Sequence, residues 1–390
     1  MSGRRNSKPP AFVPALGWCT LLVLLLGTPQ ARSESQGLHF NVSLSTNVTD
    51  NVNNAPTGEK SDFFFVYEPE IEWGRRLAAG SFSVSGGVTG YVYAKEDRLS
   101  RVYADVNTSL ELQATNRLSL TLSDRFVPTP LQYSNTDGEP TNLIQANTAN
   151  AVLLYDIPLP GYWTAHLQPG AERYDVIDWH DDIASPQEPD RTDVFVSGNF
   201  MKKVGRLAEL TLESNYRTTF FDNTSPELID HSTLGTSLDL SLRTKKWRYS
   251  LSGGLARFFK AGGDDTTWIL KTSIHWLPSS RTDIGVDAER NYSTQVNGRF
   301  FRVNSVKFGM LHKLFRRLEI SVDLLLVALD DEGLGAQDDT ALLSISPTAT
   351  YLLGKHFKIG VQYEHARRKS PNNAIEFTRN VGSLTLGATF

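Results

Sequence analysis

The chain has 390 residues, of which 21% are charged and 40% hydrophobic, with 29 Gly and 18 Pro. This composition excludes a disordered or a fibrous protein. The formal net charge of −4 gives no basic surplus with which to attract a polyanion, so we expect no nucleic-acid partner.

Residues 1–33 have the pattern of a secretory signal peptide. Three basic residues come first, an apolar run follows over residues 11–26, and a small-x-small cleavage site lies at residues 31–33. The alternative is an uncleaved membrane anchor, but Pro14 and Gly17 interrupt the run. We therefore expect export with cleavage of residues 1–33, which leaves residues 34–390 as a single domain.

The only cysteine, Cys19, lies inside this signal segment. The exported chain therefore has no disulfide and no cysteine metal site. It also contains no HExxH, GxSxG or phosphate-loop motif. We expect no cofactor, no bound metal and no enzymatic activity.

Beyond residue 33 the hydrophobic pattern has a period of two almost everywhere, and no apolar run approaches the roughly 18 to 20 residues of a spanning helix. Leu38, Phe40, Val42 and Leu44, for example, alternate with polar residues. We count about eighteen such segments of roughly 9 to 12 residues, the length with which a tilted strand crosses a bilayer. In chain order they lie near residues 38–45, 62–73, 81–92, 101–113, 118–122, 150–157, 163–174, 193–201, 206–217, 234–242, 247–255, 267–276, 282–290, 303–312, 318–326, 341–353, 357–363 and 380–390.

Short and long connections alternate along the chain. The short ones are expected at residues 74–80, 114–117, 158–162, 202–205, 243–246, 277–281, 314–317 and 353–356. The long ones are expected at residues 49–60, 94–100, 125–148, 177–191, 217–233, 260–266, 291–300, 328–340 and 366–377. An even strand count with this alternation predicts an all-β transmembrane antiparallel β-barrel, with short periplasmic turns and long extracellular loops. A soluble β-sandwich, the alternative, has no reason to send every longer loop to the same end.

The last segment explains how such a sheet would end. Leu384, Leu386, Ala388 and Phe390 share one phase, and small or polar residues take the other. An apolar strand at a free edge would promote association, whereas pairing with the first strand closes a barrel and removes the edge. The ending resembles the terminal strand of bacterial outer-membrane barrels, which finish on Phe. That resemblance implies recognition of the strand ending at Phe390 by the barrel-assembly machinery.

Aromatic residues on the apolar phase lie near the ends of the segments, where amphipathic rings favour the headgroup level. We interpret them as membrane-interface aromatics rather than core residues of a soluble double sheet. They are Trp73, Trp163, Trp247, Trp268, Trp276, Phe357 and Phe390.

The opposite phase carries charged residues of both signs, and in a barrel it faces the lumen. The lumen-lining candidates are Arg101, Tyr103, Asp105, Glu111, Glu209, Glu213, Arg217, Asp239, Arg243, Arg248, Lys271, Asp287, Asp323 and Lys358. These charges either set solute selectivity or pair with one another across a solvated wall. Tyr91, Tyr93 and Tyr103 on the same phase either stack on sugar rings or fill space.

The opening segment NVSLSTNVTDNVNNAPTGEKSDFFFVYEPEIEW, the strand over residues 118–122 with Asp124 and Arg125 after it, and the terminal Phe390 together resemble the Putative beta-barrel porin 2 family. The resemblance implies a Gram-negative outer-membrane barrel that contacts membrane lipid and lipopolysaccharide. Some members of that family resemble proteins found with exopolysaccharide export systems. The family brings no catalytic motif.

Three functional hypotheses follow. The first is a porin-like passive channel for small polar solutes or saccharides. The second is a structural or accessory barrel in exopolysaccharide export, and the third is an outer-membrane lipid hydrolase. The hydrolase requires a Ser–His pair on the outer face at the rim, so its geometry is decisive.

Overall fold

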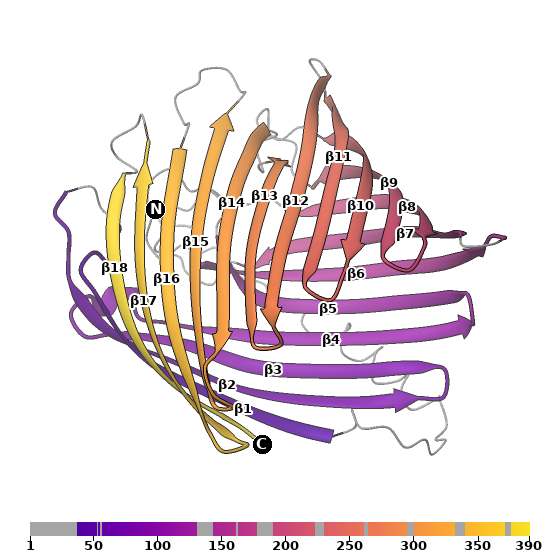
Figure 1. Cartoon of the computed structure of the whole chain (residues 1–390). Coiled ribbons are helices and arrows are strands. Elements are labelled where there is room, and N and C mark those ends of the chain that lie inside the picture. The colour runs from indigo at the N-terminus through magenta and orange to yellow at the C-terminus, as the bar shows by residue number, and fades with distance from the viewer. Residues whose placement is uncertain are drawn as a thin grey trace, which may run out of the picture.

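The fold is a closed antiparallel sheet of 18 strands. It is seen in a computed structural model that describes residues 37–52, 54, 57–130, 143–160, 163–177, 190–222, 230–260, 264–294, 300–331, 340–370 and 376–390. The predicted signal peptide and its cleavage site lie outside these residues. Figure 1 shows the strands tilted around one barrel, with the C-terminus at the end where the short turns lie.

Apart from one short 3₁₀ turn, η1 (Asp97–Leu99), the described elements are all strands. They are β1 (Gly37–Thr49), β2 (Asp62–Leu77), β3 (Gly80–Tyr93), β4 (Arg101–Thr115), β5 (Leu118–Pro130), β6 (Leu143–Pro158), β7 (Trp163–Ile177), β8 (Arg191–Val204), β9 (Ala208–Phe221), β10 (His231–Arg243), β11 (Trp247–Lys260), β12 (Asp265–Ser279), β13 (Thr282–Thr294), β14 (Phe300–Lys313), β15 (Leu318–Asp331), β16 (Thr340–Leu353), β17 (Phe357–Lys369) and β18 (Phe377–Thr389).

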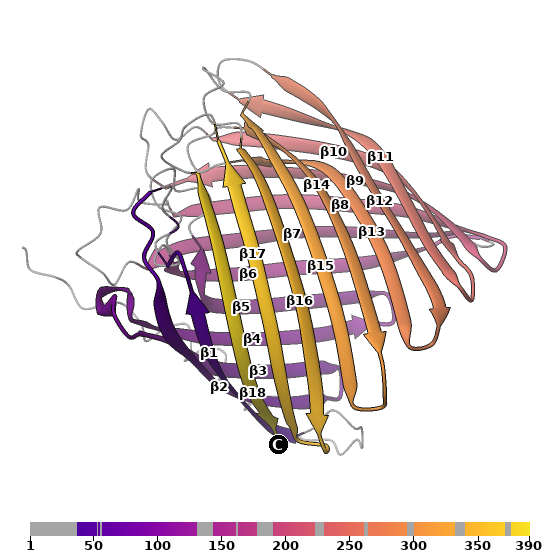
Figure 2. The ribbon, with the colours of Figure 1, turned by 60° about the vertical axis from the view of Figure 1, so that its left-hand side comes forward.

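The barrel closes where β1 pairs with β18. The antiparallel register runs from Asn41 opposite Thr389 to Thr49 opposite Val381. The Phe40 N–H donates to the Phe390 carbonyl oxygen at 3.0 Å, and the reverse bond is 2.9 Å. Every strand therefore has two partners, as Figure 2 shows for the junction of β1 and β18. The predicted barrel with its closing C-terminal strand is confirmed.

The strands are longer than the sequence pattern suggested, at 13 to 16 residues each. The predicted loop 125–148 was too long, because β5 continues to Pro130 and β6 begins at Leu143. Phe126 lies opposite Asn147 there, beyond the last clear hydrophobic alternation. A backbone ladder needs only neighbouring amides, so it continues past the level at which lipid demands apolar side chains.

The wall is one layer thick, with the apolar phase turned outward. Leu44, Leu238, Leu251 and Leu386 are each about half exposed. This excludes a two-layer soluble sheet, in which such side chains would pack against each other. Among the described residues no helix is long and apolar enough to cross a membrane.

Because the two faces of β18 differ in environment, a charged substitution should destabilise the barrel far more on the outer face than on the inner face. Leu384, near the middle of β18, is 48% exposed on the outer face, and its neighbour Thr385 lies on the inner face. Leu384→Arg should lower the free energy of unfolding from lipid by about 2–4 kcal/mol, because it places a cation in hydrocarbon. Urea titration in vesicles measures this. Thr385→Arg is the matched control and should cost much less; equal losses would contradict the assignment of faces.

Candidate functional site

The inner face is the phase that includes the buried side chains of Asn47, Thr49 and Tyr93. The strand register, followed around the barrel from these residues, places every predicted lumen-lining candidate on this phase. Arg101, Tyr103, Asp105 and Arg217 lie near the long loops. Glu213, Asp239, Lys271, Asp287 and Asp323 lie at intermediate heights. Glu111, Glu209, Arg243, Arg248 and Lys358 lie near the short turns. Their part in transport remains a prediction.

Burial along this inner face is graded. The buried hydrophobic side chains of the described strands, such as Tyr103 at 3% and Phe195 at 8% exposure, all lie in the half of the barrel next to the long loops. Inner-face residues near the short turns, such as Arg243, Arg248 and Lys358, are exposed. The interior is therefore packed at the long-loop end and open to solvent at the short-turn end.

Aromatic side chains form much of the packed end, and we call them the inner collar. It consists of Phe64, Tyr91, Tyr93, Tyr103, Tyr174, Phe195, Phe258 and Tyr292. The Phe64 and Tyr93 rings stack with centroids 4.8 Å apart, and the Phe258 and Tyr292 rings meet edge to face at 4.6 Å. Only Tyr91, Tyr93 and Tyr103 were singled out from the sequence. Such geometry provides flat apolar surfaces with polar edges.

One side of the collar is braced by the connections after β1 and β3. The buried Asp62 carboxylate accepts hydrogen bonds from the backbone N–H groups of Phe63 at 2.7 Å, Lys95 at 3.1 Å and Glu96 at 2.9 Å. Val52 packs against Tyr93 and Leu99. A carboxylate shared by several amides is a strong local constraint, because charged acceptors form the stronger hydrogen bonds.

The other side of the collar contains two arginines held by one buried carboxylate. Asp193, only 2% exposed, lies 3.3 Å from Arg217 Nη1 and 3.7 Å from Arg191 Nε. The Arg191 guanidinium lies 4.5 Å above the Tyr174 ring, and that of Arg217 lies 5.3 Å from the Phe195 ring centroid. Asp193 therefore fixes two cations beside aromatic faces, an arrangement that adds cation–π attraction to the ion pairs.

Below the collar, the charges of one wall are paired. Lys307 Nζ lies 3.1 Å from Asp323, and Lys313 Nζ lies 3.5 Å from Glu319. His275 contacts Asp283 at 2.9 Å. The sequence left open whether lumen charges pair with one another, and on β12–β15 many of them do.

The wall formed by β2 is different. Glu68, Glu70 and Glu72 follow one another on the inner phase, and all three are exposed. Among the described residues none of them has an ion-pair partner, and Glu70 accepts a 3.4 Å hydrogen bond from the Asn41 side chain. These three carboxylates therefore form a column of uncompensated negative charge.

The predicted interface aromatics all lie on the outer phase. Several meet each other near the short turns: Trp247 and Trp276 at 6.0 Å, and Phe357 and Phe390 at 5.7 Å between ring centroids. Trp73 and Trp163 contact Phe82 and Phe200 in the same belt. Trp268 lies toward the long loops, where the Arg290 guanidinium lies 4.0 Å from its ring centroid. Their position at the headgroup level remains a prediction.

The histidine contacts of the described residues do not support the hydrolase hypothesis, which requires a Ser–His pair. His365, on the outer face near the long loops, contacts the Asn380 side chain at 2.8 Å. His312 contacts Thr282, and His275 contacts Asp283. Within the described residues, the histidine hydrogen bonds that the structure gives lead to no Ser hydroxyl, and no three His, Cys, Asp or Glu side chains cluster as a metal site.

Comparison with known proteins agrees with this fold. The family model described as Putative beta-barrel porin 2 matches residues 263–390, which include β12–β18. The family resemblance suggested by the sequence is thus confirmed over that part of the chain. Among curated proteins, no sequence matches this chain.

Solved structures resemble the whole barrel. Pseudomonas aeruginosa OccK2 (OpdF) has a TM-score of 0.55 at 11% identity, and OccK9 (OpdG) has 0.54 at 12%. OpdK with vanillate, from the same organism, has 0.53 at 10%. Each match covers 90% of this chain and 98% of the other. At such low identities the likeness establishes the fold alone.

The Asp193 cluster gives a stability prediction. Asp193→Asn keeps the side-chain shape but removes the charge that Arg191 and Arg217 share, so the barrel should lose about 1–3 kcal/mol. The urea midpoint of unfolding in vesicles measures the loss. Asp239→Asn is the control, because Asp239 is only half-buried and accepts a single 3.2 Å bond from Ser237. Equal midpoints for the two variants would contradict a supporting role for Asp193.

Proposed function

We propose that this protein is a passive channel of the Gram-negative outer membrane, open to small polar solutes or saccharides. The observation that carries the proposal is one closed wall of 18 strands, with apolar residues outside and solvent-exposed charges inside. A barrel of about this strand number encloses an aqueous channel. The family match and the solved structures of the same fold, among them the outer membrane protein OpdK, support the proposal.

The proposed orientation places the long loops outside the cell and the short turns in the periplasm, after export with cleavage of the signal. The strand ending at Phe390 then serves as the address for the assembly machinery. The wider exopolysaccharide-export and lipid-hydrolase hypotheses are not carried forward, because no feature of the described residues favours either over a channel.

Selection would take place at the inner collar. A solute entering from the long-loop side first meets the aromatic faces, which suit the apolar faces of sugar rings, and the guanidinium groups of Arg191 and Arg217. It then passes into the open end, where the β2 carboxylates attract cations. The collar thus discriminates by shape, and the column of Glu68, Glu70 and Glu72 by charge.

Planar-bilayer recording of the purified protein tests the channel directly, and a sealed barrel would overturn the proposal. Replacing Tyr93 and Tyr103 by Ala removes two collar rings, so single-channel conductance should rise, by about twofold if the collar is the narrowest point. Phe65→Ala is the control, since Phe65 is 49% exposed on the outer face of the same wall. Unchanged conductance in the Tyr variant would place the constriction elsewhere.

The β2 column makes a separate prediction about ion selectivity. Changing Glu68, Glu70 and Glu72 together to Gln should shift the zero-current potential in a salt gradient toward anions, because it removes three negative charges that form no ion pair with any described residue. The control variant Lys307→Gln with Asp323→Asn removes one charge of each sign from a 3.1 Å pair, so it should shift the potential little. Equal shifts would show that the column does not face the conducting path.

A further inference from the structure

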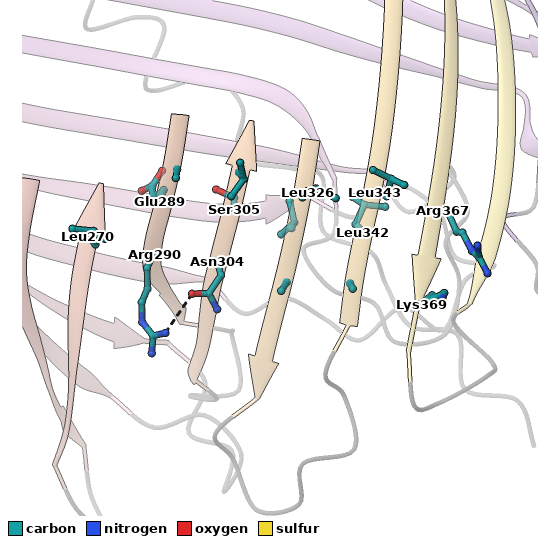
Figure 3. Close-up of a pocket in the computed structure, with 15 residues that line it drawn as sticks. Leu270, Glu289, Arg290, Asn304, Ser305, Leu326, Leu342, Leu343, Arg367 and Lys369 are labelled. Carbon is teal, nitrogen blue, oxygen red and sulfur yellow. Dashed lines mark hydrogen bonds between the residues drawn. The ribbon is translucent and has the colours of Figure 1, made fainter. Parts of the chain in front are cut away.

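The outer face has a hollow of about 660 Å³ on β12–β17, close to the long loops. Its lining residues come from the neighbouring strands β12 to β17, and Figure 3 shows how they lie. Ala288, Ala328 and Ala341 take outer positions there. Their side chains are small, so the outer surface is recessed at these positions. The larger Val306 and Leu326 border them and are exposed. The floor is therefore apolar, as a surface in contact with hydrocarbon should be.

The strand register shows how the rim is arranged. Arg290 lies opposite Asn304, Asn304 opposite Ala328, Ala328 opposite Ala341, and Ala341 opposite Lys369. These residues form one lateral row from β13 to β17, four strand spacings or roughly 19 Å wide. Arg367 lies in the next row below Lys369, opposite Leu343. The apolar floor thus has a cation at one side and two at the other.

Within the residues that the structure describes, no carboxylate pairs with the cations of this rim. Arg367 and Lys369 are exposed, and within the described part of the chain neither forms an ion pair. Arg290 lies over Trp268 and donates to Asn304 at 3.4 Å, while its Nε is buried without a hydrogen bond. Figure 3 shows the Arg290–Asn304 bond on this surface.

Two other outer-face arginines at this end, Arg173 and Arg257, are neutralised. Arg173 Nε donates to Asp175 at 2.7 Å and its Nη1 to Asp222 at 2.8 Å. Arg257 Nη2 donates to Asp264 at 2.7 Å. The hollow differs from these two places in combining an apolar depression with three cations that form no ion pair with any described residue.

We propose that this hollow is a binding site for lipopolysaccharide, with acyl chains on the apolar floor and lipid A phosphates at the basic rim. The inference rests on the proposed outer-membrane orientation, which turns this end of the barrel toward the lipopolysaccharide leaflet. A neutral lipid would leave the cations uncompensated, and a soluble anion would leave the floor uncovered. A bisphosphorylated, multiply acylated glycolipid has phosphates to pair with the cations at both ends of the row, and acyl chains to cover the apolar floor between them.

Native mass spectrometry of the purified barrel, titrated with bisphosphorylated lipid A, tests the site. Arg367→Gln with Lys369→Gln should weaken binding roughly tenfold to thirtyfold, since each basic residue near an anionic lipid contributes a factor of about five. Ala328→Leu with Ala341→Leu fills the hollow without changing charge and should also weaken binding. Lipid A without phosphates should bind the unmodified barrel poorly.

Lys202→Gln is the matched control, because it removes an outer-face cation at the short-turn end, where Lys202 Nζ lies 4.5 Å from the Trp163 ring centroid. It should leave lipid A binding unchanged. Equal binding by all variants, or equal binding of phosphatidylglycerol and lipid A, would overturn the proposal. Conductance recorded on the same samples separates the two conclusions: a conducting barrel without lipid A selectivity refutes only the site, and a sealed barrel that binds lipid A refutes only the channel.

Discussion

The structure depends on one constraint, the hydrogen bonding of the backbone in a medium without water. Each unpaired amide in hydrocarbon costs several kcal/mol, so a sheet can cross a bilayer only if it has no edge. The pairing of β1 with β18, from Asn41 opposite Thr389 to Thr49 opposite Val381, removes that edge. Once the ladder is closed, side-chain alternation alone decides what faces lipid and what faces the interior.

The closed ladder leaves the two ends of the interior free to differ. At the long-loop end, inner positions carry rings and buried carboxylates, and Asp62 and Asp193 each fix several neighbours. At the short-turn end, inner side chains such as Arg243, Arg248 and Lys358 are exposed. Rigidity and selectivity thus belong to the same level of the barrel, because a constriction can discriminate only if its side chains are held in place.

Much of the fold could be predicted from the sequence because its signals are local. Alternation of apolar and polar residues, and of short and long connections, needs only neighbouring positions, and both gave the barrel and its strand count. The collar was harder to predict. Phe195 and Phe258 interrupt a polar phase, and alternation alone gives no reason for an apolar residue there. The outer hollow depends on which residues lie opposite one another across β13–β17, and this lateral register is set by turn geometry rather than by any one segment.

Strand β13 connects the inner and outer surfaces. Its pairing with β12 extends only as far as Arg290 opposite Leu270. By alternation Tyr292 should face outward with Arg290, yet its ring packs on Phe258 inside the barrel. Release from β12 allows this turn, because a strand without a partner on one side is free to twist. Arg290, on the rim of the outer hollow, and Tyr292, in the inner collar, are therefore two residues apart, at the point where the β12 pairing ends and the β14 pairing continues. The rim of the outer hollow and the inner collar therefore share one strand.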